Sequence, residues 1–282
     1  MNAFDKRLTP ARADLAAAHL KGSIDAPAYV EGRAMVGRTG KTWIRRRPAA
    51  DAPVETELLF GETFTVYEAK DGFAWGQAAL DGYVGYVATD ALADAGVAPE
   101  WRVTASSTFV YRAADLKSPV LETLPFNARV AVGQGAYAPL ATGGFIYARH
   151  LAPLAATADD FVTVAERFLG VPYLWGGRTA LGFDCSGLVQ AALAVAGVAA
   201  PRDTDMQEAA LGAPLAFTPA LQGLKRGDLV FWKGHVGIMQ DAVRLLHANA
   251  HHMTVASEPL LKAAARIEAA GSPITSIRRI SR

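Results

Sequence analysis

The chain of 282 residues contains a single cysteine, Cys185, directly ahead of a helix-forming run at residues 186–196. The run is rich in alanine and leucine, and Gly197 follows it as a typical helix stop. A thiol in the first turn of a helix faces unpaired backbone N–H groups and the positive end of the helix dipole. Both favour the thiolate, so the sequence predicts a nucleophile with a pKa below that of a free thiol. An inert, buried cysteine is the alternative.

Two histidines supply a candidate base for this thiol. Strands predicted at 235–239 and 243–249, joined by a turn at 240–242, place His235 opposite His247. Directly opposed residues of an antiparallel pair have Cβ atoms about 4.5–5.5 Å apart. One imidazole can then act as a general base while the other orients it. The alternative is a hairpin with two unrelated histidines.

A zinc site is a further alternative, because His247, His251 and His252 lie close together in the sequence. The sequence around Cys185 lacks the short ligand pair that zinc sites in proteins typically contain. We therefore predict neither a metal nor another cofactor.

Four blocks of sequence resemble, in order and spacing, the NlpC-type cell-wall cysteine peptidases, a compact papain-like family. The blocks lie at residues 172–177, 182–190, 226–238 and 246–249. The resemblance covers about residues 154–282. It implies an α+β papain-like cysteine peptidase domain. The residue pattern itself predicts a helix laid against a three-stranded sheet, which includes a strand at 228–232.

The resemblance also implies roles for individual residues. Cys185 becomes the nucleophile, His235 the base and His247 the orienting third residue. Tyr173 matches a tyrosine beside the nucleophile, where its hydroxyl and the Cys185 N–H can bind the oxyanion. The residues that match the substrate pocket of the family are Asp184, Ser186, Arg202, Asp203 and Thr204.

Asp203 and Thr204 have a second interpretation, as the cap of a helix at 206–210. Another helix is predicted at 159–169, with Asp159 or Asp160 as its cap.

The region before the catalytic domain has the pattern of small all-β barrels, with short strands and frequent Asp-Gly turns. The pattern repeats at an offset of 66 residues, which aligns residues 42–46 with 108–112. After a five-residue deletion, Tyr86 aligns with Tyr147. The domains expected from this repeat are an N-terminal segment at 1–30 with a helix at 11–20, and barrels at 31–95 and 96–153.

Each barrel resembles a bacterial SH3-like domain. In relatives with two such domains, an acidic residue and a tyrosine of the first barrel help to hold the free amine of the substrate. Glu62 and Tyr83 match those two positions. The alternative is that the barrels are only a packing scaffold.

The composition limits the range of partners. A net charge of +1 with 20% charged residues gives no strong field toward nucleic acid or anionic lipid. The sequence shows neither a secretory signal nor a stretch that could span a membrane, so a cytoplasmic protein is expected.

Taken together, the arrangement resembles cytoplasmic muropeptide-recycling endopeptidases. It implies hydrolysis between γ-D-glutamate and the diamino acid in peptidoglycan-derived peptides of the type L-Ala-γ-D-Glu-diamino acid. The alternatives are an acyltransferase or amidase that uses the same thiol, and a non-catalytic wall-binding protein.

Overall fold

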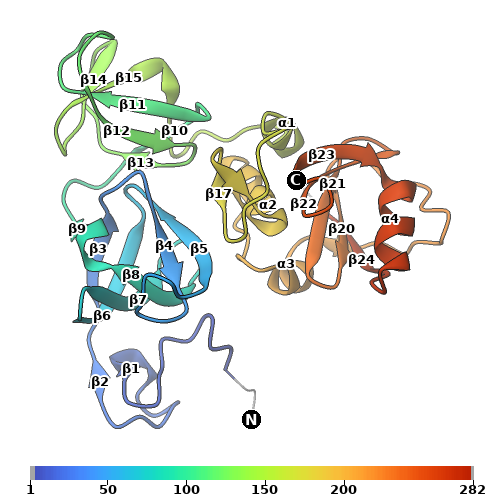
Figure 1. Cartoon of the computed structure of the whole chain (residues 1–282), viewed down its shortest axis with the longest axis horizontal. Helices are drawn as coiled ribbons and strands as arrows, with labels where there is room; N and C mark the ends of the chain where they lie inside the picture. Colours follow the sequence, from blue (N-terminus) through green and yellow to red (C-terminus); the bar gives the residue numbers. More distant parts are fainter. Residues whose placement is uncertain (1–3, 281–282) are drawn as a thin grey trace. The chain divides into compact units, whose positions relative to one another are not determined.

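The computed structural model in Figure 1 describes residues 4–280. The chain divides into two compact units, Met1–Ala155 and Ala156–Arg282. The first unit is built almost entirely of strands, and the second contains both helices and strands. No helix among residues 4–280 combines the length and the apolar character that crossing a bilayer requires.

The first strand group of the N-terminal unit is a seven-stranded sheet with the order β5-β4-β8-β7-β6-β3-β9. Ile44, Phe64 and Val87 are fully buried at its centre. The predicted turn between β6 and β7 contains Asp71 and Gly72, both with positive φ, as a tight hairpin requires. The strands are β3 (Arg33–Gly37), β4 (Lys41–Arg45), β5 (Val54–Leu59), β6 (Thr63–Lys70), β7 (Phe73–Ala78), β8 (Val84–Ala88) and β9 (Leu92–Asp94).

The second strand group has two small sheets, β13-β10-β16 and β12-β11-β15-β14, around its own core. Val103, Leu124 and Ile146 form the centre of that core. The strands are β10 (Trp101–Val103), β11 (Ser107–Tyr111), β12 (Val120–Pro125), β13 (Arg129–Val130), β14 (Tyr137–Pro139), β15 (Phe145–Tyr147) and β16 (Leu151–Pro153).

The two strand groups confirm the predicted repeat in their first halves. Strands β4 and β5 correspond to β11 and β12 at the offset of 66 residues. The predicted alignment of Tyr86 with Tyr147 was wrong by two residues. Arg45 pairs with Tyr86, and Tyr111, the counterpart of Arg45 in the second strand group, pairs with Phe145. Tyr86 therefore corresponds to Phe145 rather than Tyr147. The deletion is longer than expected because β13 and β14 are much shorter than β6 and β7.

The predicted helix at 11–20 was wrong. This stretch contains the short strand β1 (Ala16–Ala17) and a single 3-10 turn, and β1 pairs with β2 (Tyr29–Val30). The preceding residues bond to the first strand group, where the Arg7 carbonyl accepts from Val84 N at 2.7 Å. These tertiary hydrogen bonds override the helix propensity of the alanines.

The C-terminal unit is organised around a six-stranded sheet with the order β19-β24-β20-β21-β22-β23. The three predicted strands are its centre, and the expectation of a three-stranded sheet was incomplete. The strands are β19 (Ala213–Pro214), β20 (Asp228–Trp232), β21 (His235–Met239), β22 (Arg244–Asn249), β23 (Thr254–Pro259) and β24 (Ile274–Arg279), with a separate pair β17 (Arg178–Thr179) and β18 (Gly182–Phe183).

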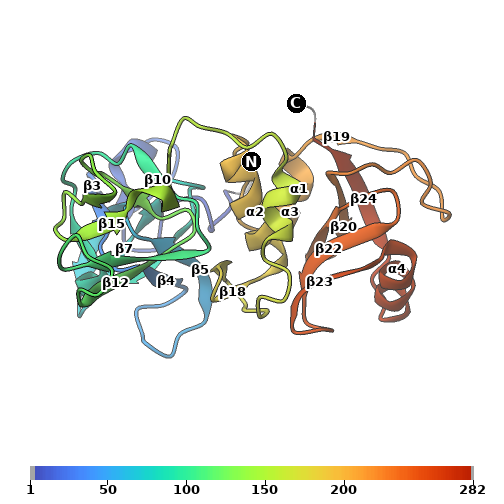
Figure 2. The same ribbon diagram turned by 90° about the horizontal axis from the view of Figure 1, so that it is seen from above.

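Helices cover both faces of this sheet, as Figures 1 and 2 show, with α2 on one side and α4 on the other. Leu260 and Ala263 of α4 pack in one core with Trp232 of the sheet. Helix α1 is shorter than predicted, and the Asp160 side chain caps it by accepting from Val162 N. The helices are α1 (Phe161–Glu166), α2 (Cys185–Val195), α3 (Thr204–Ala210) and α4 (Leu260–Ala269).

Candidate active site

Cys185 is the first residue of α2, which begins one residue before the predicted run at 186–196, and the side chain is only 7% exposed. Its predicted place at the helix entrance is confirmed. The preceding residue, Asp184, caps the helix by accepting from Gly187 N at 2.7 Å. Its second oxygen accepts from Gly176 N at 2.8 Å. One carboxylate thus ties the helix entrance to the glycine-rich segment before it.

Arg202 completes this arrangement from outside the helix. Its guanidinium binds both oxygens of Asp184, at 3.0 and 2.6 Å, and donates to Ser186 Oγ at 2.8 Å. The Arg202 side chain is almost fully buried. Asp184, Ser186 and Arg202 are thus bonded to one another around Cys185. Their predicted role in lining the substrate pocket stays a prediction.

Two glycines make the close packing at this helix entrance possible. A Cβ at Gly187 would lie 2.2 Å from the Gly177 carbonyl oxygen. A Cβ at Gly177 would in turn lie 2.4 Å from the Gly182 carbonyl oxygen. Any side chain at either position would push the glycine-rich segment away from the nucleophile.

The thiol of Cys185 lies beside the start of β21. Its Sγ is 3.8 Å from Thr204 Oγ1 and 4.0 Å from the carbonyl oxygen of Gly234, the residue before His235. Burial, reinforced by the negative charge of Asp184, raises the pKa of Cys185 to about 11. The predicted lowering of this pKa was wrong, because desolvation outweighs the hydrogen bonds from Thr204 and the backbone.

The two predicted histidines are in direct contact. His235 Nε2 lies 2.8 Å from His247 Nδ1, and the ring of Trp232 lies 5.6 Å from that of His235. Burial, and then the neighbouring His247, lower the pKa of His235 to about 3. Burial also lowers the pKa of His247 to about 4 despite the nearby Glu258 carboxylate. Both imidazoles are therefore neutral at pH 7.

The strand register that joins them differs from the prediction. Ile238 pairs with Leu246, so the continued register places Gly237, not His235, opposite His247. The loop is centred one residue later than expected because the Asp241 carboxylate accepts from the N–H groups at 243 and 244. This moves the register by two residues, so both histidines stay on one face and meet diagonally.

Sequence reasoning missed the residues behind His247. Glu258 Oε1 lies 2.9 Å from His247 Nε2. Arg266 donates to both Glu258 oxygens, at 2.7 and 2.6 Å. The bonds from Arg266 and His247 lower the pKa of Glu258 to about 2. We call the four residues His235, His247, Glu258 and Arg266 the relay. An acidic residue on the strand after His247 was the available signal.

Tyr173 is half-buried. Its backbone forms an isolated β-bridge with Phe183, and Phe183 lies two residues before Cys185. Its N–H donates to the Met253 carbonyl at 3.0 Å. Burial, with added effects from the charges of Cys185 and Asp184, raises the pKa of the Tyr173 phenol. Its hydroxyl is therefore protonated at pH 7 and able to donate a hydrogen bond.

Asp203 and Thr204 lie at the start of α3, which begins two residues earlier than predicted. Asp203 occupies the N-cap position, yet its side chain makes no capping hydrogen bond. Thr204 is buried, with its hydroxyl toward the thiol. Of the two roles weighed for Asp203, side-chain capping is therefore wrong.

Glu62 and Tyr83 belong to the N-terminal unit, where both are only 3% exposed. The Glu62 carboxylate accepts from Leu59 N at 2.9 Å, which closes the turn after β5. The Tyr83 hydroxyl lies 3.5 Å from Glu55 Oε2. Their role in substrate binding stays a prediction.

A cation site can be drawn around the relay. Among residues 4–280, ligand atoms of His247, His252 and Glu258 lie within 4.8 Å of one another, a set that differs from the predicted zinc alternative. A cation at this place would compete with Arg266, which already donates to both carboxylate oxygens. The distances of 2.6–2.9 Å that join His247, Glu258 and Arg266 are those of hydrogen bonds between these side chains.

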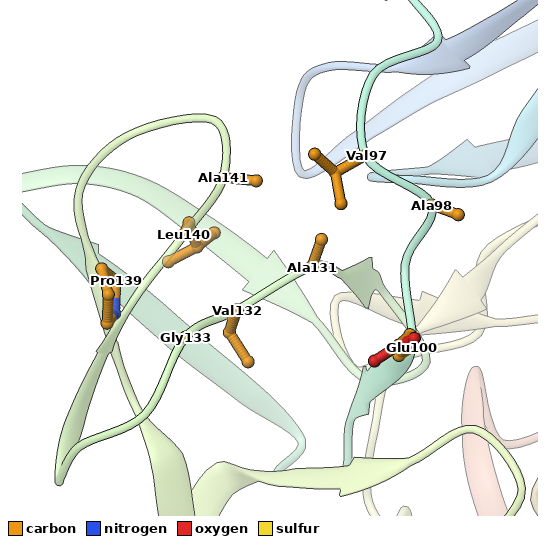
Figure 3. A pocket seen from close by; sticks show the side chains of 9 residues that line it. All are labelled: Val97, Ala98, Glu100, Ala131, Val132, Gly133, Pro139, Leu140 and Ala141. Carbon is orange, nitrogen blue, oxygen red and sulfur yellow. The ribbon is translucent and has the colours of Figure 1, made fainter.

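A separate hollow of about 490 Å³ lies in the N-terminal unit (Figure 3). The connecting segment with Val97 and Glu100 forms one wall, and loops with Ala131 and Pro139 form the other. Glu100 is the titratable side chain of an otherwise apolar lining, and the hollow contains none of the predicted site residues.

Two protein-family models match parts of the chain. The model of the NlpC/P60 family matches residues 170–264, and that of the bacterial dipeptidyl-peptidase Sh3 domain matches residues 44–92. The chain is similar to a solved NlpC/P60 family protein from Bacillus cereus, with a TM-score of 0.73 at 19% identity. That likeness covers 87% of this chain and 99% of the other, and it shows the fold.

Two of the similar sequences share one functional name. A gamma-D-glutamyl-L-lysine dipeptidyl-peptidase of Bacillus subtilis is 31% identical over 160 residues, which is 52% of each chain. A protein of the same name from Bacillus cereus is 27% identical over 205 residues, 64% of this chain and 60% of that one. The chain thus spans little more than half the length of these relatives. Residues 170–264 form a domain of the NlpC/P60 family, and an SH3 domain of the bacterial dipeptidyl-peptidase type precedes it.

Proposed function

We propose that the chain is a cysteine peptidase that hydrolyses the γ-D-glutamyl–diamino acid bond of peptidoglycan-derived peptides with a free N-terminal L-Ala. One observation carries the chemistry: a helix-entrance thiol beside the strand whose first residue, His235, is bonded to His247. The names of the two dipeptidyl-peptidase relatives support the bond type.

The proposed reaction starts from a neutral thiol and a neutral imidazole, which agrees with the pKa directions of Cys185 and His235. His235 removes the thiol proton as the sulfur attacks the amide carbonyl carbon. The Cys185 N–H and the Tyr173 hydroxyl donate to the oxyanion. His235 then protonates the leaving amine, and water, deprotonated by His235, hydrolyses the thioester and restores the thiol.

The Asp184–Arg202 pair acts in this proposal by holding the nucleophile in place, since its bonds are made within the protein. Asp203 is the proposed partner of the free substrate amine. It is the neighbour in sequence of Thr204, whose hydroxyl is 3.8 Å from the thiol.

The test is digestion of L-Ala-γ-D-Glu-diaminopimelate and of the lysine peptide, followed by mass spectrometry. We expect the dipeptide L-Ala-γ-D-Glu from both, with no product from the Cys185→Ser variant. N-acetylated substrate should react at least about tenfold more slowly, the equivalent of one lost charged hydrogen bond. Equal rates on free and acetylated peptides would reject recognition of the substrate amine. If the peptides stay intact with protein whose Cys185 thiol still reacts with iodoacetamide, the peptidase assignment is rejected.

We propose that this activity serves the recycling of wall peptides in the cytoplasm. A lone thiol catalyst without a disulfide suits a reducing compartment. In the source organism, loss of the gene should raise free tripeptide in the cytoplasmic fraction. Unchanged tripeptide, with accumulation in the culture medium instead, would reject this setting.

A further inference from the structure

The relay crosses three neighbouring strands and ends on a helix. His235 is on β21, His247 on β22, Glu258 on β23 and Arg266 on α4. Successive members are joined by contacts of 2.8, 2.9 and 2.6 Å. His247, at the middle of this chain, is only 1% exposed, so its ring nitrogens have protein partners rather than solvent.

The proton positions follow from the acceptor at the end of the relay. Arg266 can only donate, and the ionised Glu258 can only accept. His247 must therefore donate to Glu258 from Nε2, which leaves its Nδ1 as an acceptor. Nε2 of His235 then donates to that Nδ1. The remaining ring nitrogen of His235, Nδ1, is then unprotonated and is the basic atom of that ring.

We propose that Glu258, held by Arg266, is a positioning residue that fixes the tautomers of His247 and His235 and so selects the basic nitrogen of His235. The inference rests on the proposed function for its catalytic consequence. Its structural part concerns proton positions in the resting protein and is measurable without any substrate.

Strand geometry explains why a glutamate is needed here. His247 pairs with Ala256, and Glu258 lies two residues further along β23 on the same face. Such diagonal neighbours have Cα atoms about 7–8 Å apart, within reach of a long side chain but not of aspartate. Competition from His252 is small, because its Nδ1 lies 3.9 Å from Glu258 and 3.0 Å from Asn249 Oδ1.

The decisive experiment is ¹⁵N NMR of full-length, histidine-labelled Cys185→Ala protein. This variant has no turnover, and His235→Gln and His247→Gln versions assign the two rings. We expect both rings as the Nε2–H tautomer. In Glu258→Gln, whose amide can also donate, and in Glu258→Leu, which has no acceptor, the Nδ1–H form should appear in both rings. Unchanged tautomers in both variants would overturn the proposal.

The kinetic arm uses the catalytically complete protein. Glu258→Gln should lower kcat about 10–100-fold with KM within about twofold of wild type, as when a tautomer-setting group is lost. Arg266→Lys, which keeps the positive charge, should recover part of an Arg266→Met loss. Glu268→Gln, an exposed site on the same helix, is the matched control and should match wild type.

The NMR and kinetic measurements distinguish the peptidase assignment from the proton-positioning role of Glu258. An inactive wild type with the expected tautomer change would reject the peptidase assignment and keep the proton-positioning role. A tautomer change without any loss of kcat would reject the positioning role in catalysis. Thermal unfolding of each variant shows whether a loss of kcat comes from unfolding, and in that case the NMR result on the folded fraction decides.

Discussion

Two arginine–carboxylate pairs of the C-terminal unit have the same geometry and different consequences. Arg202 binds both oxygens of Asp184 at the entrance of α2, and Arg266 binds both oxygens of Glu258 beside β23. Asp184 also accepts from the backbone N–H groups of Gly176 and Gly187, with a longer contact of 3.4 Å from the Ser186 hydroxyl. Glu258 bonds otherwise to a titratable ring, that of His247.

This difference shows what each pair controls. A carboxylate that accepts from backbone N–H groups fixes the position of that backbone, because those donors keep their protons. A carboxylate that accepts from an imidazole fixes which ring nitrogen carries the proton, because the ring can hold it on either nitrogen. The Asp184 pair is nearly fully buried, whereas Arg266 keeps 29% of its side-chain surface exposed. We therefore expect the first pair to matter most for stability and the second for rate.

The largest expected effect is that of Arg202→Met. It leaves Asp184 buried with its charge unpaired, which typically costs about 3–5 kcal/mol. Urea unfolding should show this loss, and activity should fall with the folded fraction. Arg244→Met, at an exposed arginine of β22, is the control. A loss below about 1 kcal/mol would mean that the helix entrance does not depend on this pair.

Acid should lower the stability of the C-terminal unit, because the buried histidines of the relay have pKa values below their ordinary value. The pKa of His247 is about 4 in the fold against 6.5 ordinarily, so the unfolded chain binds more protons between these values. Stability therefore falls as the pH drops from 6.5 to 4, by about 2 kcal/mol at pH 5 from this group. Chemical unfolding at several pH values measures the slope. An equally steep slope in His247→Gln would contradict this assignment.

Arg266→Met should sharpen the contrast with Arg202→Met. Because the pair is partly exposed, we expect a loss of about 1 kcal/mol or less in stability. The kcat should nevertheless fall by about tenfold, since Glu258 loses the group that holds it. Parallel unfolding and rate measurements test this. A stability loss as large as that of Arg202→Met would remove the distinction between the two pairs.

The smallest expected effect is that of Thr204→Val at the thiol. The Thr204 hydroxyl is 3.8 Å from Sγ and favours the thiolate only weakly against burial. We expect kcat/KM to change by less than about threefold, about 0.6 kcal/mol. The pH midpoint of iodoacetamide labelling should move upward. A downward shift would show that the hydroxyl stabilises the neutral thiol instead.

Local sequence determined much of this architecture. Helix α2 begins within one residue of the predicted place because Asp184 is a strong capping residue, and Gly197 follows its end with positive φ. Alternation and tight turns placed β20 and β21 at their predicted bounds. The offset of 66 residues between β4 and β11 also followed from residue patterns alone. These features depend on contacts within a few residues.

Only the tertiary structure decided the rest. The alanines at 11–20 are not helical because the backbone of Ala16 and Ala17 pairs with β2 instead of with the preceding helical turn. The pKa of Cys185 rises rather than falls because desolvation depends on everything packed around it. Glu258 joins His247 because β23 pairs with β22 in one register, and Arg266 joins Glu258 because α4 covers that face. Register and burial arise from long-range packing, which no local pattern records.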